Sequence, residues 1–369
     1  MSETGDKDLL AGIRGQIDAI DEQLQSLINE RARLARTIGE TKFPEPVGLS
    51  PGPRDYYRPE REAEILRRVL ERNAGPLKDE EMLRLFREIM SACLAQQEPP
   101  KVAFLGPEGT FSQAAVLKQF GHSVRALAVP SIEEVFHDVE AGIAEFGVVP
   151  VENSTEGTVS NTLDMLMSTP LLISGEIELR IRQHLLGRMA ALEAVRKVYS
   201  HPHSLAQCRA WLEQRLPGVE QVAVASNAEA ARMAAGEEGA AAIAGETAAE
   251  VYGLQPLMTN IEDRPDNTTR FLVIGREAPG PSGRDKTSLL LSSRHKAGAL
   301  QELLEPLSRH RVSMTRIESR PSRRRKWDYV FFVDIEGHRD DGHVAAALEE
   351  LAGVAAWYRV LGSYPAAIL

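Results

Sequence analysis

Apolar positions at helical spacing dominate roughly the first hundred residues of the chain. Between residues 9 and 42 they alternate steps of four and three, which is typical of a coiled-coil seam on one long helix. The seam consists of Ile13, Ile17, Ile20, Leu24, Leu27, Leu34 and Ile38. At about 1.5 Å per residue, this helix would be about 50 Å long. Two short neighbouring helices cannot cover such a seam, so we expect a dimer.

A Pro- and Gly-rich stretch over 43–57 ends the long helix. Pro59 suits the first turn of a second helix. The apolar stripes of the second and third helices are formed by Ile65, Leu66, Val69, Met82, Phe86, Ile89, Met90 and Cys93. These patterns predict an all-α unit over residues 6–98.

Short apolar runs alternate with helical patterns over 101–278, between linkers rich in Pro, Gly and polar residues at 96–100 and 277–283. Capping boxes of the S-x-x-E/Q type occur at 131–134, 204–207 and 226–229, each after a β-like run. Alternating β and α units predict a mostly parallel sheet. A long strand over 176–186 is expected to cross between two lobes.

The last region, 286–369, has the order β (286–293), α (298–309), β (312–320), β (327–335), α (343–351), β (355–361). This order is that of a ferredoxin-like α+β domain. The whole chain is therefore predicted to contain three domains of different fold class.

Composition narrows the functional classes. The 369 residues are 43% hydrophobic and 26% charged, as in ordinary globular proteins, and carry a net charge of −10, which disfavours nucleic acid. The basic run 322–326 is interpreted as a solvated hairpin tip. No apolar run reaches the ~20 residues of a membrane span, and the polar start is not a signal peptide. Two cysteines, Cys93 and Cys208, fit a reducing cytoplasm and form no zinc site.

Polar side chains interrupt the apolar stripes of the helical unit. Arg31 takes a seam position, and Lys42 lies eleven residues on, about 20° from it around the helix. Glu62 and Gln97 fall on the apolar faces of the second and third helices. Because charges in a core need partners, this set predicts a pocket for a small anionic ligand. Internal salt bridges such as Arg31–Glu62 are the alternative, and both interpretations stay open.

Arg14 lies 17 residues before Arg31 and about 100° from it around the helix. It points away from its own pocket; in an antiparallel dimer it would reach the partner's pocket, and otherwise it is a solvated arginine. The spacing of the whole set resembles that of the all-helical chorismate mutases, over about residues 6–98. The matching residues are Arg14, Arg31, Lys42, Arg61, Glu62, Cys93 and Gln97.

The resemblance implies an intertwined dimer that rearranges chorismate to prephenate. This unimolecular rearrangement needs no nucleophile or general base, only conformational capture and electrostatics. By resemblance, Arg14 from the partner and Arg31 hold the two carboxylates. Lys42 and Gln97 donate to the ether oxygen, and Glu62 accepts from the ring hydroxyl. Arg61 and Cys93 line the site.

Four motifs of the middle region lie at strand ends and turns: GPEGTFSQAA (106–115), VPVENSTEG (149–157), YSHPHSLAQC (199–208) and NTTRF (267–271). The first is a strand–turn–helix junction, where backbone N–H groups bind anions well. Taken one at a time, three residues of these motifs have purely structural explanations. Ser200 ends a strand, Gln207 is the partner in a capping box, and Thr269 is a threonine within a strand. All four in this order resemble prephenate dehydratase.

That resemblance implies two α/β lobes, similar to periplasmic binding proteins, with the site in the cleft. Prephenate loses its ring hydroxyl and CO₂ to give phenylpyruvate, and the departing hydroxide needs a donor. Thr269 is expected to activate the leaving group, and Arg270 to neutralise a carboxylate or to order its strand. The other residues expected in the cleft are Glu152, Asn153, Ser154, Thr155, Ser200 and Gln207.

The last region resembles ACT domains, which bind amino acids at dimer interfaces. Segments 295–300 and 317–321 resemble the phenylalanine-binding motifs of the dehydratase family. Feedback inhibition by phenylalanine is implied, through a shift between two conformations. The binding residues implied are Gly298, Ala299, Leu300, Glu318, Ser319, Arg320 and Pro321.

The resemblances together predict an enzyme that carries out both reactions as a homodimer or larger oligomer, without cofactor or metal. Two alternatives stay open. One is a dehydratase whose helical unit is degenerate and kept for dimerisation, which Arg58, in place of an acid three residues before the Arg-Glu pair, would favour. The other is a non-catalytic amino-acid sensor.

Overall fold

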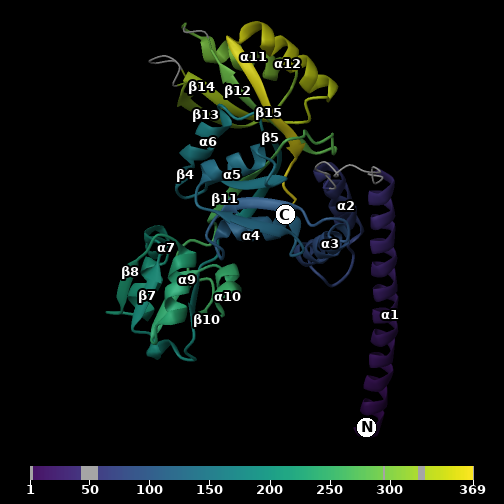
Figure 1. The fold of residues 1–369 in the computed structure, drawn as a ribbon, viewed down its shortest axis with the longest axis vertical. Helices are drawn as coiled ribbons and strands as arrows, with labels where there is room; N and C mark the ends of the chain where they lie inside the picture. The colour runs from purple at the N-terminus through teal and green to yellow at the C-terminus, as the bar shows by residue number, and fades with distance from the viewer. Residues whose placement is uncertain (1–2, 43–56, 294–295, 323–328, 369) are drawn as a thin grey trace, which may run out of the picture.

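The computed structural model describes residues 3–42, 57–293, 296–322 and 329–368, with side chains over 7–41 in the first of these ranges (Figure 1). An all-α region is followed by a two-lobed α/β region and then by an antiparallel sheet carrying two helices. The predicted fold class is therefore confirmed for all three regions.

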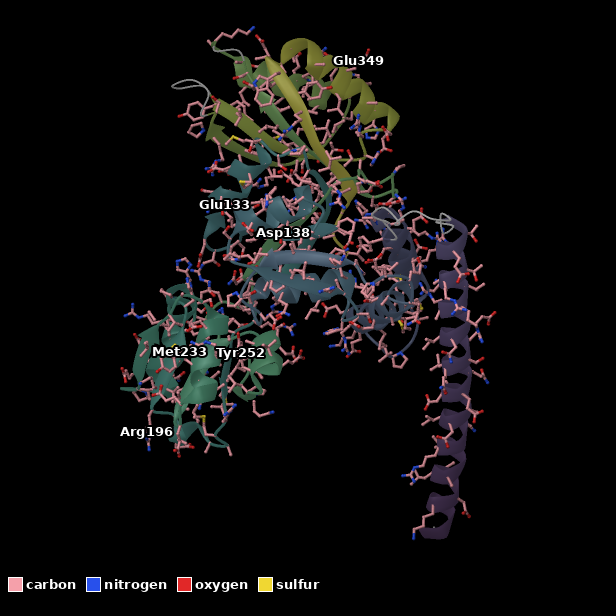
Figure 2. The ribbon with its side chains drawn as sticks, viewed as in Figure 1. Glu133, Asp138, Arg196, Met233, Tyr252 and Glu349 are labelled. Atoms are coloured by element: carbon pink, nitrogen blue, oxygen red, sulfur yellow. The ribbon has the colours of Figure 1, made fainter. Side chains whose placement is uncertain are left out.

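The helical region consists of α1 (Glu3–Lys42), α2 (Pro59–Arg72) and α3 (Asp79–Leu94). The long helix α1 has 40 residues and extends away from the rest of the molecule (Figure 1). Ten of its leucines and isoleucines are 39–64% exposed, and Figure 2 shows no element facing most of its length. The predicted seam is thus uncovered within one chain. The predicted break at 43–57 lies outside the described residues except for Tyr57.

The first lobe is a sheet of strand order β2-β1-β3-β11-β5, with β4 paired to β3. Its strands are β1 (Lys101–Leu105), β2 (Arg125–Val129), β3 (Phe146–Asn153), β4 (Gly157–Thr158), β5 (Leu172–Arg180) and β11 (Thr268–Gly275). Its helices are α4 (Phe111–Phe120), α5 (Ile132–Glu140) and α6 (Ser160–Leu166). Strand β11 runs antiparallel to β3 and β5. The prediction of a mostly parallel sheet is wrong here, because the chain returns from the second lobe into the middle of this sheet.

The second lobe has the strand order β10-β6-β9-β7-β8. Its strands are β6 (His184–Gly187), β7 (Lys197–Ser200), β8 (Glu220–Ala223), β9 (Ala240–Ala244) and β10 (Gln255–Met258). Its helices are η1 (Leu192–Ala194), α7 (Pro202–Gln207), α8 (Arg209–Arg215), α9 (Asn227–Gly236) and α10 (Glu246–Tyr252). The chain crosses between lobes at 181–183 and 259–267, so the predicted long strand 176–186 is two strands, β5 and β6.

Helix starts follow the predicted capping boxes in two of three cases. Ser131 Oγ accepts from Glu134 N, and Ser226 Oγ accepts from Glu229 N. The third prediction is wrong because α7 already begins at Pro202, which leaves Ser204 inside the helix. A proline at N1 replaces the serine as the start signal.

The C-terminal region is a sheet of order β13-β14-β12-β15 with two helices, the predicted ferredoxin-like arrangement. Its elements are β12 (Asp285–Ser292), α11 (Ala299–Arg309), β13 (Met314–Pro321), β14 (Tyr329–Glu336), α12 (Gly342–Val354) and β15 (Trp357–Pro365). Leu289 and Leu291 pack under the helices, whereas Leu290 packs on the first lobe. One face of this sheet is therefore buried against the middle region. The predicted hairpin tip, 322–326, lies outside the described residues except for Ser322.

Candidate active sites

A cavity of about 1150 Å³ lies where α1, α2 and α3 approach α4. It brings together five of the seven residues predicted in the helical region: Arg31, Arg61, Glu62, Cys93 and Gln97. The Gln97 amide donates to the Ala35 carbonyl of α1. It also lies against Gly39, where a Cβ would clash with it. Glycine at 39 therefore lets the long helix approach the third helix at the cavity wall.

Arg31 and Glu62 do not neutralise each other in this cavity. Arg31 is partly buried and forms no ion pair or hydrogen bond with any residue that the structure describes. Glu62 Oε1 is buried without a hydrogen-bond partner. The predicted alternative of an internal Arg31–Glu62 salt bridge is therefore not formed within the described chain. Because burying a polar or charged atom without a partner is costly, these two side chains fit a site for a polar, charged ligand.

Burial raises the pKa of Glu62 to about 7, against the opposing effects of the Arg87 charge and a hydrogen bond with Tyr57. Six arginines and three glutamates line the cavity in total. Arg61, one of the six, is exposed and paired with Glu64 at 2.7 Å. The balance near neutral pH is cationic, which suits a dianionic ligand despite the net charge of −10 on the chain.

Two predicted residues are not part of this cavity as the structure describes it. Arg14 lies on the free length of α1, about 25 Å along the helix from Arg31. The side chain of Lys42 lies outside the described residues. Leu34 and Ile38 of the exposed seam line the cavity, so the seam forms part of its wall.

Sequence reasoning missed Arg87, which lines the cavity beside Glu62. Burial lowers the pKa of its guanidinium, and the charge of Glu62 raises it. Its Nη2 donates to the Ile368 carbonyl at 2.9 Å, and the Ile368 side chain packs on the core of α2 and α3. The C-terminal tail thus holds a wall of the N-terminal cavity, a contact between residues 281 positions apart for which local sequence carries no signal.

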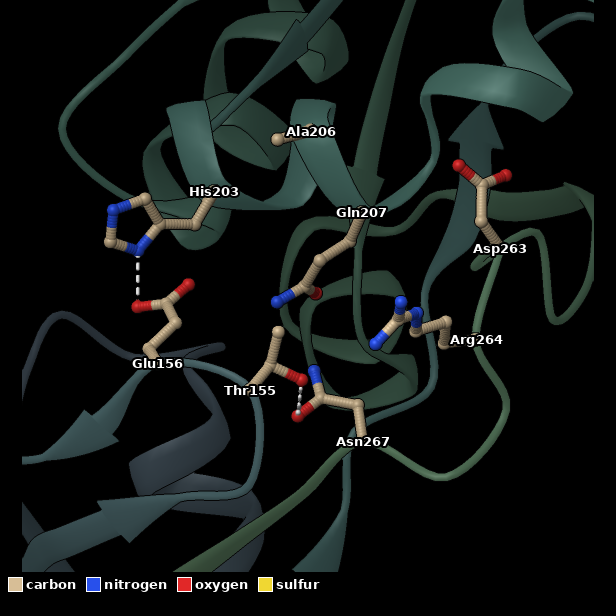
Figure 3. Close-up of a pocket in the computed structure, with 8 residues that line it drawn as sticks. All are labelled: Thr155, Glu156, His203, Ala206, Gln207, Asp263, Arg264 and Asn267. Carbon is tan, nitrogen blue, oxygen red and sulfur yellow. Dashed lines mark hydrogen bonds and ion pairs between the residues drawn. The ribbon is translucent and has the colours of Figure 1, made fainter.

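A second cavity, of about 560 Å³, lies between the lobes of the middle region (Figure 3). The loop after β3, helix α7 and the crossing segment 259–267 form its walls. Eight residues line it: Thr155, Glu156, His203, Ala206, Gln207, Asp263, Arg264 and Asn267. Glu156 and His203 form a contact across the cleft between the two lobes (Figure 3).

Asn153 connects the expected catalytic threonine to this cavity. Its Nδ2 donates to Thr269 Oγ1 at 2.8 Å and to Asn267 Oδ1 at 2.9 Å. Its Oδ1 accepts from the backbone N–H groups of Thr155 and Glu156. Every hydrogen-bonding atom of the Asn153 amide is therefore used, and its orientation is fixed by two backbone donors.

Strand register corrects two predicted cleft residues. Thr269 pairs with Asn153, and the next pair is Arg270 with Glu152. Neighbouring residues of a strand point to opposite faces, so Glu152 and Arg270 face away from the cleft. There Glu152 pairs with Arg316 of β13 at 2.9 Å. The sequence motifs alone predict that Glu152, Asn153, Thr269 and Arg270 share one site.

Arg270 instead joins the C-terminal sheet to the first lobe. Its guanidinium pairs with Glu176 at 2.8 Å and Asp334 at 2.6 Å, and donates to the Tyr364 hydroxyl. Glu176 also pairs with Lys286. Of the two roles predicted for Arg270, ordering its strand fits this contact, and neutralising a substrate carboxylate does not.

The remaining predicted cleft residues differ in placement. Gln207 lines the cavity, and its Oε1 accepts from Gln183. Ser200 does not line the cavity, contrary to the prediction. Its fully buried hydroxyl donates to Ile243 O and Asn227 Oδ1 inside the second lobe. Ser154 accepts from Thr268 N at the outer end of the strands.

Six of the eight lining residues were not predicted from the sequence: Glu156, His203, Ala206, Asp263, Arg264 and Asn267. The first three and Asn267 lie within the four motifs, and Asp263 and Arg264 lie just before the last motif. Arg264 lines the cleft, is exposed, and forms no ion pair with any residue that the structure describes. Asn267 is 3% exposed, and its Nδ2 is buried without a partner.

The predicted regulatory residues lie at two places of the C-terminal sheet. Gly298 precedes α11 with φ of 78°, a conformation that favours glycine, and Ala299 and Leu300 begin that helix. On β13, Arg320 pairs with Asp164 of α6 at 3.0 Å. Glu318, Ser319 and Pro321 share this strand. Within one chain, Arg320 thus contacts the first lobe.

Across the described ranges, no His, Cys, Asp and Glu side chains cluster in the numbers that a metal ion needs. Over the same ranges, no helix combines the length and apolar character of a membrane span. Cys93 and Cys208 are buried free thiols. Cys93 lines the helical cavity, and burial raises the pKa of Cys208 far above its ordinary value.

Known protein families match the three regions in order. The matching family models are chorismate mutase type II over residues 13–98, prephenate dehydratase over 102–279 and the ACT domain over 287–353. A "Bifunctional chorismate mutase/prephenate dehydratase" of Stutzerimonas stutzeri is 52% identical over 98% of this chain and 99% of that protein. A protein of the same description from Pseudomonas aeruginosa is 51% identical over 99% of this chain and 100% of its own.

Among solved structures, a prephenate dehydratase from Arthrobacter aurescens in complex with L-Phe resembles the middle and C-terminal regions. It is 34% identical, has a TM-score of 0.65, and covers 72% of this chain and 89% of its own. The similarity extends over the full length in the curated relatives and over two regions in this structure.

Proposed function

The chain belongs to the family of bifunctional chorismate mutase/prephenate dehydratases, and from this premise we propose how its residues share the two reactions. The enzyme rearranges chorismate to prephenate, then removes the ring hydroxyl and CO₂ to give phenylpyruvate. We assign the mutase to residues 6–98, the dehydratase to 101–278 and regulation to 286–369.

In the mutase cavity, Arg31 binds a carboxylate of chorismate, and Gln97 and Lys42 donate to the ether oxygen, where charge develops as the C–O bond breaks. Glu62 accepts from the ring hydroxyl. Two observations among the described residues support these roles: Arg31 forms no ion pair, and Glu62 Oε1 has no hydrogen-bond partner. Arg87 adds positive charge beside Glu62.

The mutase works as a dimer in this proposal. A second copy would cover the exposed seam of α1, because an uncovered apolar stripe of this length is unfavourable in water. The partner's copy of α1 would bring its Arg14 to the cavity of this chain. Chorismate would then be held by cations from two chains.

In the dehydratase cleft, Thr269 donates to the ring hydroxyl as it leaves, and Asn153 positions it. Gln207 and Thr155 contact the substrate from opposite lobes, with Ser154 at the outer end of the strands. Arg264 neutralises a carboxylate. Binding of a dianion in a cleft of a net acidic chain depends on such local cations.

We propose that phenylalanine inhibits the dehydratase through the C-terminal domain, because the similar structure from Arthrobacter aurescens holds L-Phe. Strands β3 and β11 carry Asn153 and Thr269 on one face and Glu152 and Arg270 on the other. The second face contacts β13 and β14 directly. A shift of that sheet would move the catalytic strands. The free thiols support the cytoplasm as the location.

This assignment is carried by one observation on the described residues: Arg31 without an ion pair and Glu62 Oε1 without a hydrogen-bond partner lie in the same cavity. The experiment is an assay of the purified chain that follows chorismate loss and phenylpyruvate formation, with and without phenylalanine. We expect both reactions, with phenylalanine lowering phenylpyruvate formation. Loss of chorismate conversion alone would indicate a degenerate mutase region, and loss of both reactions would indicate a sensor.

A further inference from the structure

Asn267 presents an unused hydrogen-bond donor in the wall of the dehydratase cleft. The residue is 3% exposed, yet its Nδ2 has no partner among the described residues. Buried polar groups are nearly always hydrogen-bonded, because an unsatisfied one costs free energy. The amide nitrogen is directed towards the Gln207 side of the cavity (Figure 3).

The direction of this amide follows from its neighbours. The backbone N–H groups of Thr155 and Glu156 require the oxygen of Asn153, so Asn153 presents its NH₂ to Asn267. The oxygen of Asn267 accepts that donor, which leaves the NH₂ of Asn267 for the cleft. A flipped Asn267 would place two NH₂ groups against each other.

The same relay orients the hydroxyl of Thr269. Its oxygen accepts from Asn153 Nδ2, and its proton goes to no acceptor among the described residues. Thr269 and Asn267 are thus both bonded to one amide nitrogen, at 2.8 and 2.9 Å, and each keeps a free donor.

We propose that Asn267 is a second donor to the leaving oxygen of prephenate, beside Thr269; this inference rests on the dehydratase assignment. The C–O bond breaks with its electron pair on oxygen, which departs as hydroxide. The pair of the bond to the ring carboxylate enters the ring as CO₂ leaves, and the ring becomes aromatic. Two fixed donors stabilise the charge that grows on the oxygen in the transition state.

The test is Asn267→Asp in the full chain, assayed with added prephenate and, separately, with chorismate. The aspartate keeps an oxygen where Asn153 donates, but replaces the free NH₂ with a second oxygen. A purely structural role survives this change. We expect kcat for dehydration to fall roughly tenfold to a hundredfold, KM to change less, and mutase activity to stay constant. Activity should recover as falling pH protonates the new carboxyl and restores a donor.

The matched control is Asn161→Asp at an exposed position of α6, which adds the same charge outside the cleft lining and should leave kcat unchanged. If Asn267→Asp also loses mutase activity through misfolding, Asn267→Ala is measured with the same expectation for kcat. An unchanged kcat, or an effect on KM alone, overturns the proposal. Wild-type enzyme that leaves prephenate unchanged would instead overturn the dehydratase assignment itself.

Discussion

The two active sites of this chain differ in how much of each a single copy contains. The dehydratase cleft has walls from both lobes, and its amide relay closes within one chain. The mutase cavity lies beside a 40-residue helix whose apolar seam is exposed, and Arg14 lies far from it. Fixed backbone hydrogen bonds define the first site. The mutase site depends on helix packing that a single chain does not complete.

The largest effect is expected for Thr269→Ala. Loss of the donor to the leaving hydroxyl should lower kcat for dehydration about a hundredfold to a thousandfold. The mutase reaction of the same chain should be unchanged, since Thr269 is not among the residues that line the mutase cavity. Stopped assays with chorismate and with prephenate measure both. Full dehydratase turnover would remove Thr269 from the mechanism.

Leu24→Asp tests whether the mutase site, but not the dehydratase site, requires a dimer. A charge in the buried seam of a dimer is unfavourable, so mutase activity should fall roughly tenfold or more as dimers dissociate. Dehydratase activity should remain. Gln25→Asp places the same charge on a neighbouring position as the control. Gel filtration with both assays provides the measurement, and equal loss of the two activities would contradict separate requirements.

Arg270 and Arg264 form the next contrast. Removing one partner of a buried ion pair typically costs about 3–5 kcal/mol, so Arg270→Gln should lower the melting temperature and leave KM for prephenate nearly constant. Arg264→Gln removes an exposed, unpaired cation, so it should raise KM and leave stability constant. Calorimetry and steady-state kinetics distinguish them. If Arg270→Gln instead raised KM and left stability constant, Arg270 would be a residue of the cleft.

The smallest effect concerns Glu62, whose pKa burial raises to about 7 from an ordinary value of 4.5. Between these values the folded state binds more protons than the unfolded state, so this group lowers stability as pH rises from about 4.5 to 7. Glu62→Gln removes that dependence. Its melting temperature relative to wild type should therefore increase over this range and then level off. A difference that is constant with pH would argue against the raised pKa.

Sequence patterns predicted the helical cavity better than the cleft. Periodicity alone put Arg31, Glu62 and Gln97 on inward faces, and the structure brings them together. In the cleft, the motifs marked the right loops but grouped Asn153 with Glu152 and Thr269 with Arg270. Alternation along a strand separates such neighbours, yet the face that meets the cleft is decided by the second lobe and by the C-terminal sheet.

Contacts between distant parts of the chain could not be predicted from local sequence patterns. The Arg87–Ile368 hydrogen bond joins the first and last regions of the chain, and Arg270 meets Asp334 across a domain boundary. Neither position shows a pattern that distinguishes it from a solvated charge. The return of β11 into the first sheet also depends on the whole middle region and not on its own residues.

The claim that two chains build each mutase site, while one chain builds each dehydratase site, is tested most directly by mixing inactive variants. Arg14→Ala and Arg31→Ala chains are each expected to lack mutase activity and to keep dehydratase activity. After dissociation and reassociation, half of the dimers are mixed, and each mixed dimer contains one intact site. We predict recovery of about one quarter of wild-type mutase activity. No recovery on mixing, with mixed dimers demonstrated, would show that Arg14 and Arg31 do not act across the dimer.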